Sequence, residues 1–240
     1  MSEMADKMVK CFDYPYTLFG AGTDCSEIMS AYEEKKRIGK EKGFTPVIVP
    51  VDDILLEYWG ILEDEKYSVE ATIRDAASKD GKTILDARYK GYLEEFGIPE
   101  KDLVGEFEDG PDILDEYSSF VDFGSFDIVE TIIFEVPTAN PWEVVAYLPF
   151  GGWNDCPSPE DMVAVCKYWF DKYGAVPVTI SHDIMEMSVP ECVGEGNALE
   201  LAKEHYAFST DRVDQGTRTY TISEVAASLA VSKIWFFWWD

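Results

Sequence analysis

Basic residues are scarce in this sequence, and their scarcity excludes the partners that basic patches bind. The 240-residue chain has 20 Lys and Arg against 47 Asp and Glu, so its formal net charge is −27 at pH 7. Proteins bind nucleic acid and anionic membrane surfaces through clustered Lys and Arg. We therefore expect neither a nucleic acid nor a membrane as partner. The charge favours a basic protein, attracted by the long-range field of the surplus carboxylates; the alternative is charge that serves solubility alone.

Several sequence features of common protein classes are also missing. No apolar run approaches the roughly eighteen residues of a membrane span, and the first residues contain no apolar core of a secretory signal. The five cysteines form no CxxC pair, which argues against a zinc ribbon or a thioredoxin-like site and favours reduced thiols in the cytoplasm. P-loop, GxGxxG, HExxH and GxSxG motifs are absent as well. The sequence therefore indicates no cofactor and no known catalytic class, and it leaves the oligomeric state open.

What the sequence does contain is a succession of helix and strand patterns typical of α+β proteins. Before residue 100 they predict strands at 16–21 and 45–51 and helices at 26–42, from Asp52 or Asp53 onward, and twice within 68–97. The C-terminal part predicts the order β-α-β-β-α-α-β, with elements at 144–148, 158–173, 176–181, 184–189, 197–206, 222–231 and 234–239. We expect helices packed on a mostly antiparallel or mixed sheet, and a loose start over residues 1–14.

The stretch 100–135 differs in composition from the rest of the chain. It contains twelve acids and a single base, Lys101, together with several aromatic residues. A disordered acidic tail would lack those aromatic side chains. We therefore predict an acidic, surface-exposed segment that leads into a strand at 128–136. It is also the best candidate for a boundary between an N-terminal region, 1–136, and a C-terminal domain, 137–240.

The C-terminal residues carry a series of motifs in a fixed order. The motifs are LPFGGWNDCP at 148–157, YW at 168–169, YGAVP at 173–177, ISHD at 180–183, AKE at 202–204, YAF at 206–208, VDQG at 213–216 and WFFWWD at 235–240. In these motifs, residues 137–240 resemble the bacterial domain-of-unknown-function family DUF4253. The family has no established activity, so the resemblance implies a domain boundary and no mechanism. By analogy it suggests an immunity-type protein that neutralises a basic toxin.

The loop from Gly151 to Pro157 is the first candidate site. Trp153 offers a stacking face, Asn154 and Asp155 offer polar contacts, and the glycines allow close approach of a ligand. Cys156 directly precedes a predicted helix, whose N-terminal field would lower the pKa of the thiol. The alternative is structural, because Asn and Asp also cap turns and Trp also fills cores.

His182 and Asp183, between two predicted strands, are the second candidate. His182 at a strand end can project into a cleft where Asp183 orients it, although such a pair can also only satisfy the hydrogen bonds of a turn. With Cys156 they would form a nucleophile and its base. With Asp211 added they would form a metal site made mostly of carboxylates. Nothing in the spacing requires either arrangement, and we predict no metal site.

The residues predicted to bind a ligand are therefore Trp153, Asn154, Asp155, Cys156, His182, Asp183 and Asp211, with Cys156, His182 and Asp183 as candidate catalytic residues. The remaining histidine, His205, lies on an apolar helix face and is expected to be half-buried and hydrogen-bonded. Two functional hypotheses remain. The first is a non-enzymatic acidic interaction module that binds a basic partner. The alternative is an enzyme or a small-molecule or metal binder with its pocket at the GGWNDCP loop and His182.

Overall fold

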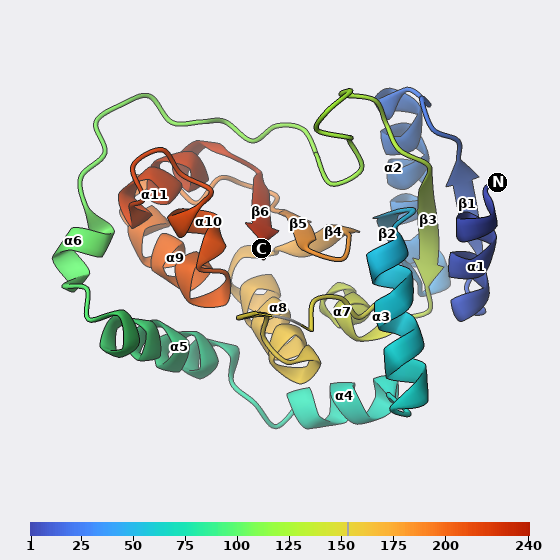
Figure 1. Cartoon of the computed structure of the whole chain (residues 1–240), viewed down its shortest axis with the longest axis horizontal. Helices are drawn as coiled ribbons and strands as arrows, with labels where there is room; N and C mark the ends of the chain where they lie inside the picture. The colour runs from blue at the N-terminus through green and yellow to red at the C-terminus, as the bar shows by residue number, and fades with distance from the viewer. Residues whose placement is uncertain (153) are drawn as a thin grey trace.

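The computed structural model describes residues 1–152 and 154–240, so Trp153 lies outside the described residues. One six-stranded sheet runs through the molecule, and helices cover both of its faces (Figure 1). The strand order is β1-β3-β2-β4-β5-β6, with β1 Tyr16–Phe19, β2 Thr45–Pro50, β3 Thr131–Val136, β4 Val176–Ile180, β5 Ile184–Ser188 and β6 Ile234–Trp238. Neighbouring strands are antiparallel except for the parallel pair β2–β4. The predicted α+β class and mixed sheet are confirmed.

The helices up to residue 104 follow the predicted pattern with two additions, one at residues 3–11 and one at residues 100–104. They are α1 Glu3–Cys11, α2 Cys25–Lys42, α3 Asp53–Asp64, α4 Val69–Ala76, α5 Gly81–Phe96 and the short α6 Glu100–Val104. Asp52 caps α3 through the amides of its first turn, and Gly43 ends α2 in the left-handed conformation. The expected loose start is wrong, because Ser2 caps α1 and Met8 is fully buried on its inner face.

The helices of the C-terminal part are α7 Val144–Tyr147, α8 Pro159–Tyr173, α9 Glu195–Phe208, α10 Asp211–Asp214 and α11 Ile222–Val231. The strand predicted at 144–148 is wrong, because these residues form α7 after a 3-10 turn at Pro141–Glu143. Pro141 favours the first position of a helical turn, and Glu143 accepts hydrogen bonds from Thr138 and Asn140. Burial of Val144 and Val145 then overrides their strand preference. The other predicted C-terminal elements fall close to their predicted positions, and α10 is an additional short helix that was not predicted.

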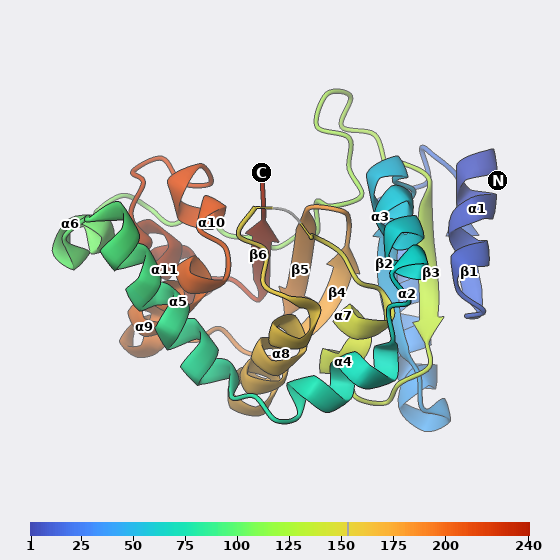
Figure 2. The same cartoon turned by 60° about the horizontal axis from the view of Figure 1, so that its bottom comes forward.

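Side chains from the two faces of the sheet enter two cores. The larger core lies under α3, α7, α8 and α9 and includes Trp169, Trp235 and Phe237, all fully buried. The smaller core lies under α2 and includes Ile48 and Ile133. This division follows from the alternation of side chains along a strand. Figure 2 shows α2 on the far side of the sheet from α3.

The predicted acidic segment lies on the surface between α6 and β3. We call residues 105–130 the acidic strap; within it, a single bridge pairs Val121 with Ile128. The strap crosses the molecule from α6, beside the C-terminal helices, to the region of α2 (Figure 1). Over the described residues, no helix has the length and apolar character needed to cross a membrane. The division of the chain at residue 136 stays a prediction.

Candidate functional site

The parallel pair β2–β4 brings two segments together that are far apart in the sequence. Asp52 lies two residues after the end of β2, while His182 and Asp183 lie two and three residues after the end of β4, so all three lie at the same end of this parallel strand pair. His182 Nδ1 contacts Asp52 Oδ2, and the His182 backbone N–H donates to the same oxygen at 3.3 Å. In open α/β sheets, ligands bind at the C-terminal ends of parallel strands. The sequence indicated Asp52 only as a helix cap, because pairing between β2 and β4 cannot be read from spacing.

The imidazole of His182 lies between two carboxylates. Its Nε2 is 3.6 Å from Asp183 Oδ2, which also accepts a hydrogen bond of 3.0 Å from Trp238 Nε1. The second Asp183 oxygen accepts from Ser181 Oγ at 2.9 Å. About a quarter of the His182 side chain remains exposed, 26% against 11% for Asp52. The ring is therefore fixed by its neighbours and still reaches solvent.

The charges at this edge stabilise an ion pair. Burial lowers the pKa of His182, but the carboxylate of Asp52, with smaller effects of Asp183 and Asp53, outweighs burial and raises it above its ordinary value. Burial raises the pKa of Asp52, and hydrogen bonds from His182 and from the α3 amide of Leu55 outweigh it and lower the pKa. The pair therefore favours imidazolium and carboxylate, an arrangement that can bind an anion or donate a proton and is a poor general base.

The loop at 151–157 holds its cysteine in a half-buried position. Burial raises the pKa of Cys156 to about 12, although the Gly152 N–H and Arg88 partly oppose this. The expected lowering of the pKa by the helix is therefore wrong, since the cap of α8 is Ser158 and the thiol lies outside that first turn. Gly151, at φ +78°, allows the approach, because a Cβ there would lie 2.5 Å from the Cys156 sulfur.

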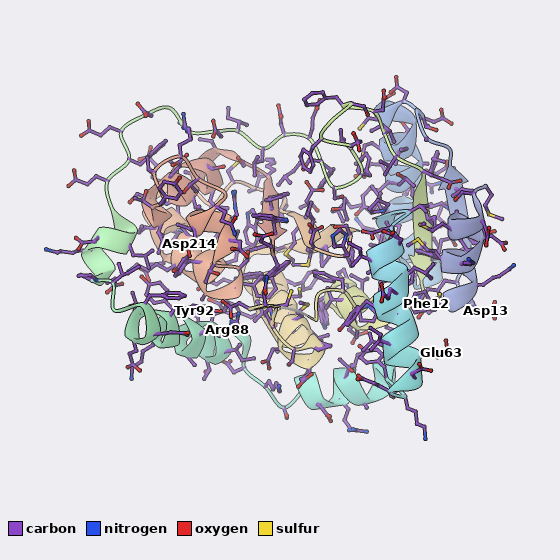
Figure 3. All side chains as sticks on the ribbon, viewed as in Figure 1. Phe12, Asp13, Glu63, Arg88, Tyr92 and Asp214 are labelled. Atoms are coloured by element: carbon purple, nitrogen blue, oxygen red, sulfur yellow. The ribbon has the colours of Figure 1, made fainter. Side chains whose placement is uncertain are left out.

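The other candidates, Asn154 and Asp155 of this loop and Asp211 of α10, do not form one group with His182. Arg88 and Tyr92 lie beside each other on α5 (Figure 3), and Arg88 donates to the carbonyls of Asp155 and Ala207. Asp211 accepts from the Asp240 amide at 3.0 Å and from Gln215 Nε2 at 2.8 Å. These contacts hold the loop at 151–157 and the C-terminal residue in place. Asn154 and Asp155 are exposed.

Cys156 and His182 lie in different electrostatic environments. The charges acting on the thiol come from Arg88, Asp211 and Asp155, whereas those acting on His182 come from Asp52, Asp183 and Asp53. The two segments are joined where the Gly151 amide donates to the His182 carbonyl at 3.2 Å. Within 1–152 and 154–240, no three His, Cys, Asp or Glu side chains are grouped so that they could hold a metal ion. Binding by the predicted ligand residues, of which Trp153 lies outside the described part, stays a prediction.

A second candidate surface is the tip of the acidic strap. Phe123 is 69% exposed and Phe126 is 80% exposed. Their turn is closed by hydrogen bonds of 2.9 Å from the Asp122 amide to the Asp127 carbonyl and 2.7 Å from the Phe126 amide to the Asp122 carbonyl. Phe126 has φ +60°, an unfavourable conformation for a bulky residue. The turn therefore exposes two aromatic rings to solvent although the backbone conformation of Phe126 is unfavourable. Figure 2 shows this yellow-green loop projecting from the body.

The strap is attached to the body by Phe120, which is buried in the smaller core, and by hydrogen bonds of its backbone. Buried Glu186 on β5 accepts hydrogen bonds from the amides of Ser118 and Ser119, at 2.8 and 3.2 Å, and from Thr179 Oγ1 at 2.7 Å. Ser228 Oγ on α11 donates to the Asp112 carbonyl at 2.7 Å. Because these anchors use main-chain groups, the strap carboxylates remain directed outward.

Few cations neutralise the strap carboxylates. Over the described residues, their ion pairs are those of Asp112 with Arg218 at 3.8 Å and Glu130 with the N-terminal amine at 3.9 Å. The exposed acids Glu106, Glu108, Asp109, Asp115, Asp122 and Asp127 have no such pair. The strap is therefore a fixed, negatively charged surface.

The fold and these surfaces define an acidic α+β protein whose C-terminal half follows a known sequence pattern. Residues 132–240 match the family model described as Domain of unknown function (DUF4253), so the C-terminal part of the chain carries this domain. The predicted resemblance is confirmed, and the match begins five residues earlier than predicted, so that it includes all of β3 except Thr131. No curated protein and no solved structure matches the chain.

Proposed function

We propose that this protein is a non-enzymatic interaction protein of the bacterial cytoplasm that binds a basic protein through the acidic strap. The observation that carries the proposal is the tip of the strap, where Phe123 and Phe126 are exposed between Asp122 and Asp127. Protein interfaces combine aromatic anchors with a charged rim, and a few such anchors supply most of the binding energy. A fixed turn lowers the entropy that binding costs.

The charge of the molecule supports the same partner. A net charge of −27 attracts a cationic protein over long range and raises its association rate, whereas it repels polyanions. An immunity-type protein that neutralises a basic toxin is one function of this kind. In this proposal the catalytic candidates are structural, which agrees with the raised pKa of the Cys156 thiol.

The test is titration of the full-length protein with the basic proteins encoded beside its gene, by calorimetry at low and high salt. We expect binding that weakens with salt, because exposed charge pairs are screened. The double variant F123A/F126A should weaken binding by about 2 kcal/mol or more, or roughly thirtyfold. The control Y220A removes an aromatic side chain that is 65% exposed outside the strap and should leave binding unchanged.

Two variants with the same net charge distinguish the effect of the strap carboxylates from the effect of the overall charge. One variant changes Glu108, Asp109 and Asp127 of the strap to amides. The other makes the same change at Glu27, Glu34 and Glu57, which are exposed and have no ion pair within the described part of the chain. Both remove three negative charges. The proposal requires that the strap variant bind more weakly than the control variant. Equal affinities, or binding that salt does not affect, would contradict it.

A second candidate function, a small-molecule site, is favoured by the His182 environment. An imidazolium held by Asp52 and open to solvent can bind an anionic ligand group. The test is NMR titration of the His182 ring with small carboxylates and with phosphate. Ring signals that do not move, or that move equally in a D52N variant, would exclude this function.

A further inference from the structure

A cavity at the opposite edge of the sheet has the dimensions of a ligand site. Its volume is about 600 Å³, within the range of roughly 300–1,000 Å³ typical of small-molecule pockets. It lies where β2 and β4 begin, and the two strands are paired only at Ile48 and Thr179. Pro46 and Pro177 near the strand starts lack the N–H that a ladder requires. The strands therefore remain unjoined at their first residues, and the cavity opens there.

The walls of the cavity are apolar and fixed in shape. They include Phe44, Pro46, Phe170, Val176, Val189 and Pro190. Gly39 lies on one wall, where a Cβ would be 2.3 Å from the Phe44 carbonyl oxygen. On another wall, a Cβ at Gly174 would lie 3.2 Å from Pro190. Glycines at these close contacts let the wall segments approach one another, and the prolines have restricted backbone angles.

The charge at this cavity is opposite to that of the rest of the molecule. Residues 35–42 of α2 contain five of the 20 basic residues of the chain, and two of them, Lys36 and Lys40, line the cavity. Lys36 is 3.4 Å from Glu33 and lies over the Tyr32 ring. Lys40 is exposed, and over the described residues it has no carboxylate at ion-pair distance. In a protein of net charge −27, an uncompensated lysine beside an apolar cavity favours an anion.

We infer that this cavity binds a small amphipathic carboxylate, with its apolar body between α2, β2 and β4 and its carboxylate at Lys40. The apolar walls require an apolar body, and the lysine selects a negative head over a neutral or cationic one. A polyanion is excluded by the charge of the surrounding surface. The inference does not depend on binding at the strap tip, which uses other residues.

The test uses the full chain and decanoate as probe, measured by calorimetry below its micelle concentration. Acetate has the head group alone, and decyltrimethylammonium has the apolar body with a cationic head. We expect decanoate to bind and both others to bind at least about tenfold more weakly, as loss of apolar burial or of one charge-assisted hydrogen bond predicts.

Three variants test whether decanoate binds in this cavity. K40M should weaken decanoate binding about tenfold, the effect of one charge-assisted hydrogen bond at a partly solvated site. K42M is the matched control, because Lys42 is also exposed at the end of α2 and does not line the cavity. A139W places a large side chain at an exposed position of the cavity rim and should abolish binding without entering the core.

The outcomes that overturn the inference are equally specific. They are the absence of decanoate binding, equal binding of decanoate and the cationic probe, and equal effects of K40M and K42M. Binding that A139W leaves intact would place the ligand elsewhere. Self-association of the chain that A139W abolishes, measured by sedimentation, would assign the cavity to a second copy of the protein and also overturn the inference.

Discussion

Replacement of His205 by Phe should change how the stability of the protein depends on pH. His205 on α9 is completely buried, and its ring lies 4.5 Å from that of Phe237, 4.9 Å from Trp235 and 5.3 Å from Trp169 between centroids. Over the described residues, neither ring nitrogen has a hydrogen-bond partner. The expectation of a half-buried, hydrogen-bonded residue is therefore wrong. Burial, with a smaller effect of Arg212, holds the pKa of His205 well below its ordinary value.

The magnitude follows from proton linkage. Below an unfolded pKa of about 6.5, the unfolded chain binds a proton at this histidine and the folded chain does not, so falling pH favours unfolding. The loss amounts to about 0.4 kcal/mol at pH ~6.5 and about 1.4 kcal/mol at pH ~5.5. The H205F variant lacks this proton, so its unfolding free energy should gain about 1 kcal/mol relative to the wild type over that interval. Overpacking by the larger Phe ring changes the unfolding free energy by the same amount at both pH values, so it leaves this difference unchanged.

The assay is urea unfolding followed by tryptophan fluorescence at several pH values. The chain has only two histidines, and the other provides a control of opposite sign. Because the pKa of His182 is raised, its contribution to stability is complete below its unfolded pKa and is lost as pH rises through its folded pKa. H182Q should therefore be most destabilised at low pH. Identical pH slopes for H205F and the wild type would refute the reasoning for His205.

Three further predictions follow from the same contacts. D52N removes the carboxylate that raises the pKa of His182, so an NMR pH titration should show a lower pKa; an unchanged value would contradict the pairing. E186Q weakens the hydrogen bonds that hold the acidic strap and should lower the unfolding free energy by about 2 kcal/mol. Limited proteolysis should then cleave the variant faster than the wild type within residues 105–130. Iodoacetamide at pH about 8 should label exposed Cys11 and spare Cys156, whose pKa is about 12; mass spectrometry of the folded protein would detect the reverse order.

Much of the fold was predictable because local signals agreed with the tertiary structure. Ser158 followed by Pro159 predicted the start of α8, and β-branched residues between prolines predicted β2 as a buried strand. The same local reasoning failed at 144–148, where β-branched residues form α7. There the burial of a short helical turn decided the conformation, and no pattern of five residues contains that information.

The candidate sites show the same limit. His182 was predicted from its position between two strands, but its partner Asp52 is 130 residues away in the sequence and meets it only through the parallel pair β2–β4. The aromatic residues of the acidic segment predict that it is ordered. Their exposure at Phe123 and Phe126 depends on a turn closed by backbone hydrogen bonds, which composition does not reveal. The cavity beside Lys40 likewise requires two strands to diverge, which is a property of the assembled sheet.

The strand order has a consequence for any attempt to use the DUF4253 region alone. Strand β2, which precedes residue 132, lies between β3 and β4, both of which belong to the matched region. A fragment starting at residue 132 would leave β3 without either neighbour and expose one side of β4. Unpaired strand edges of this kind recruit other chains. We expect such a fragment to aggregate, and to become soluble when a separately expressed fragment 1–131 supplies the missing strands in trans.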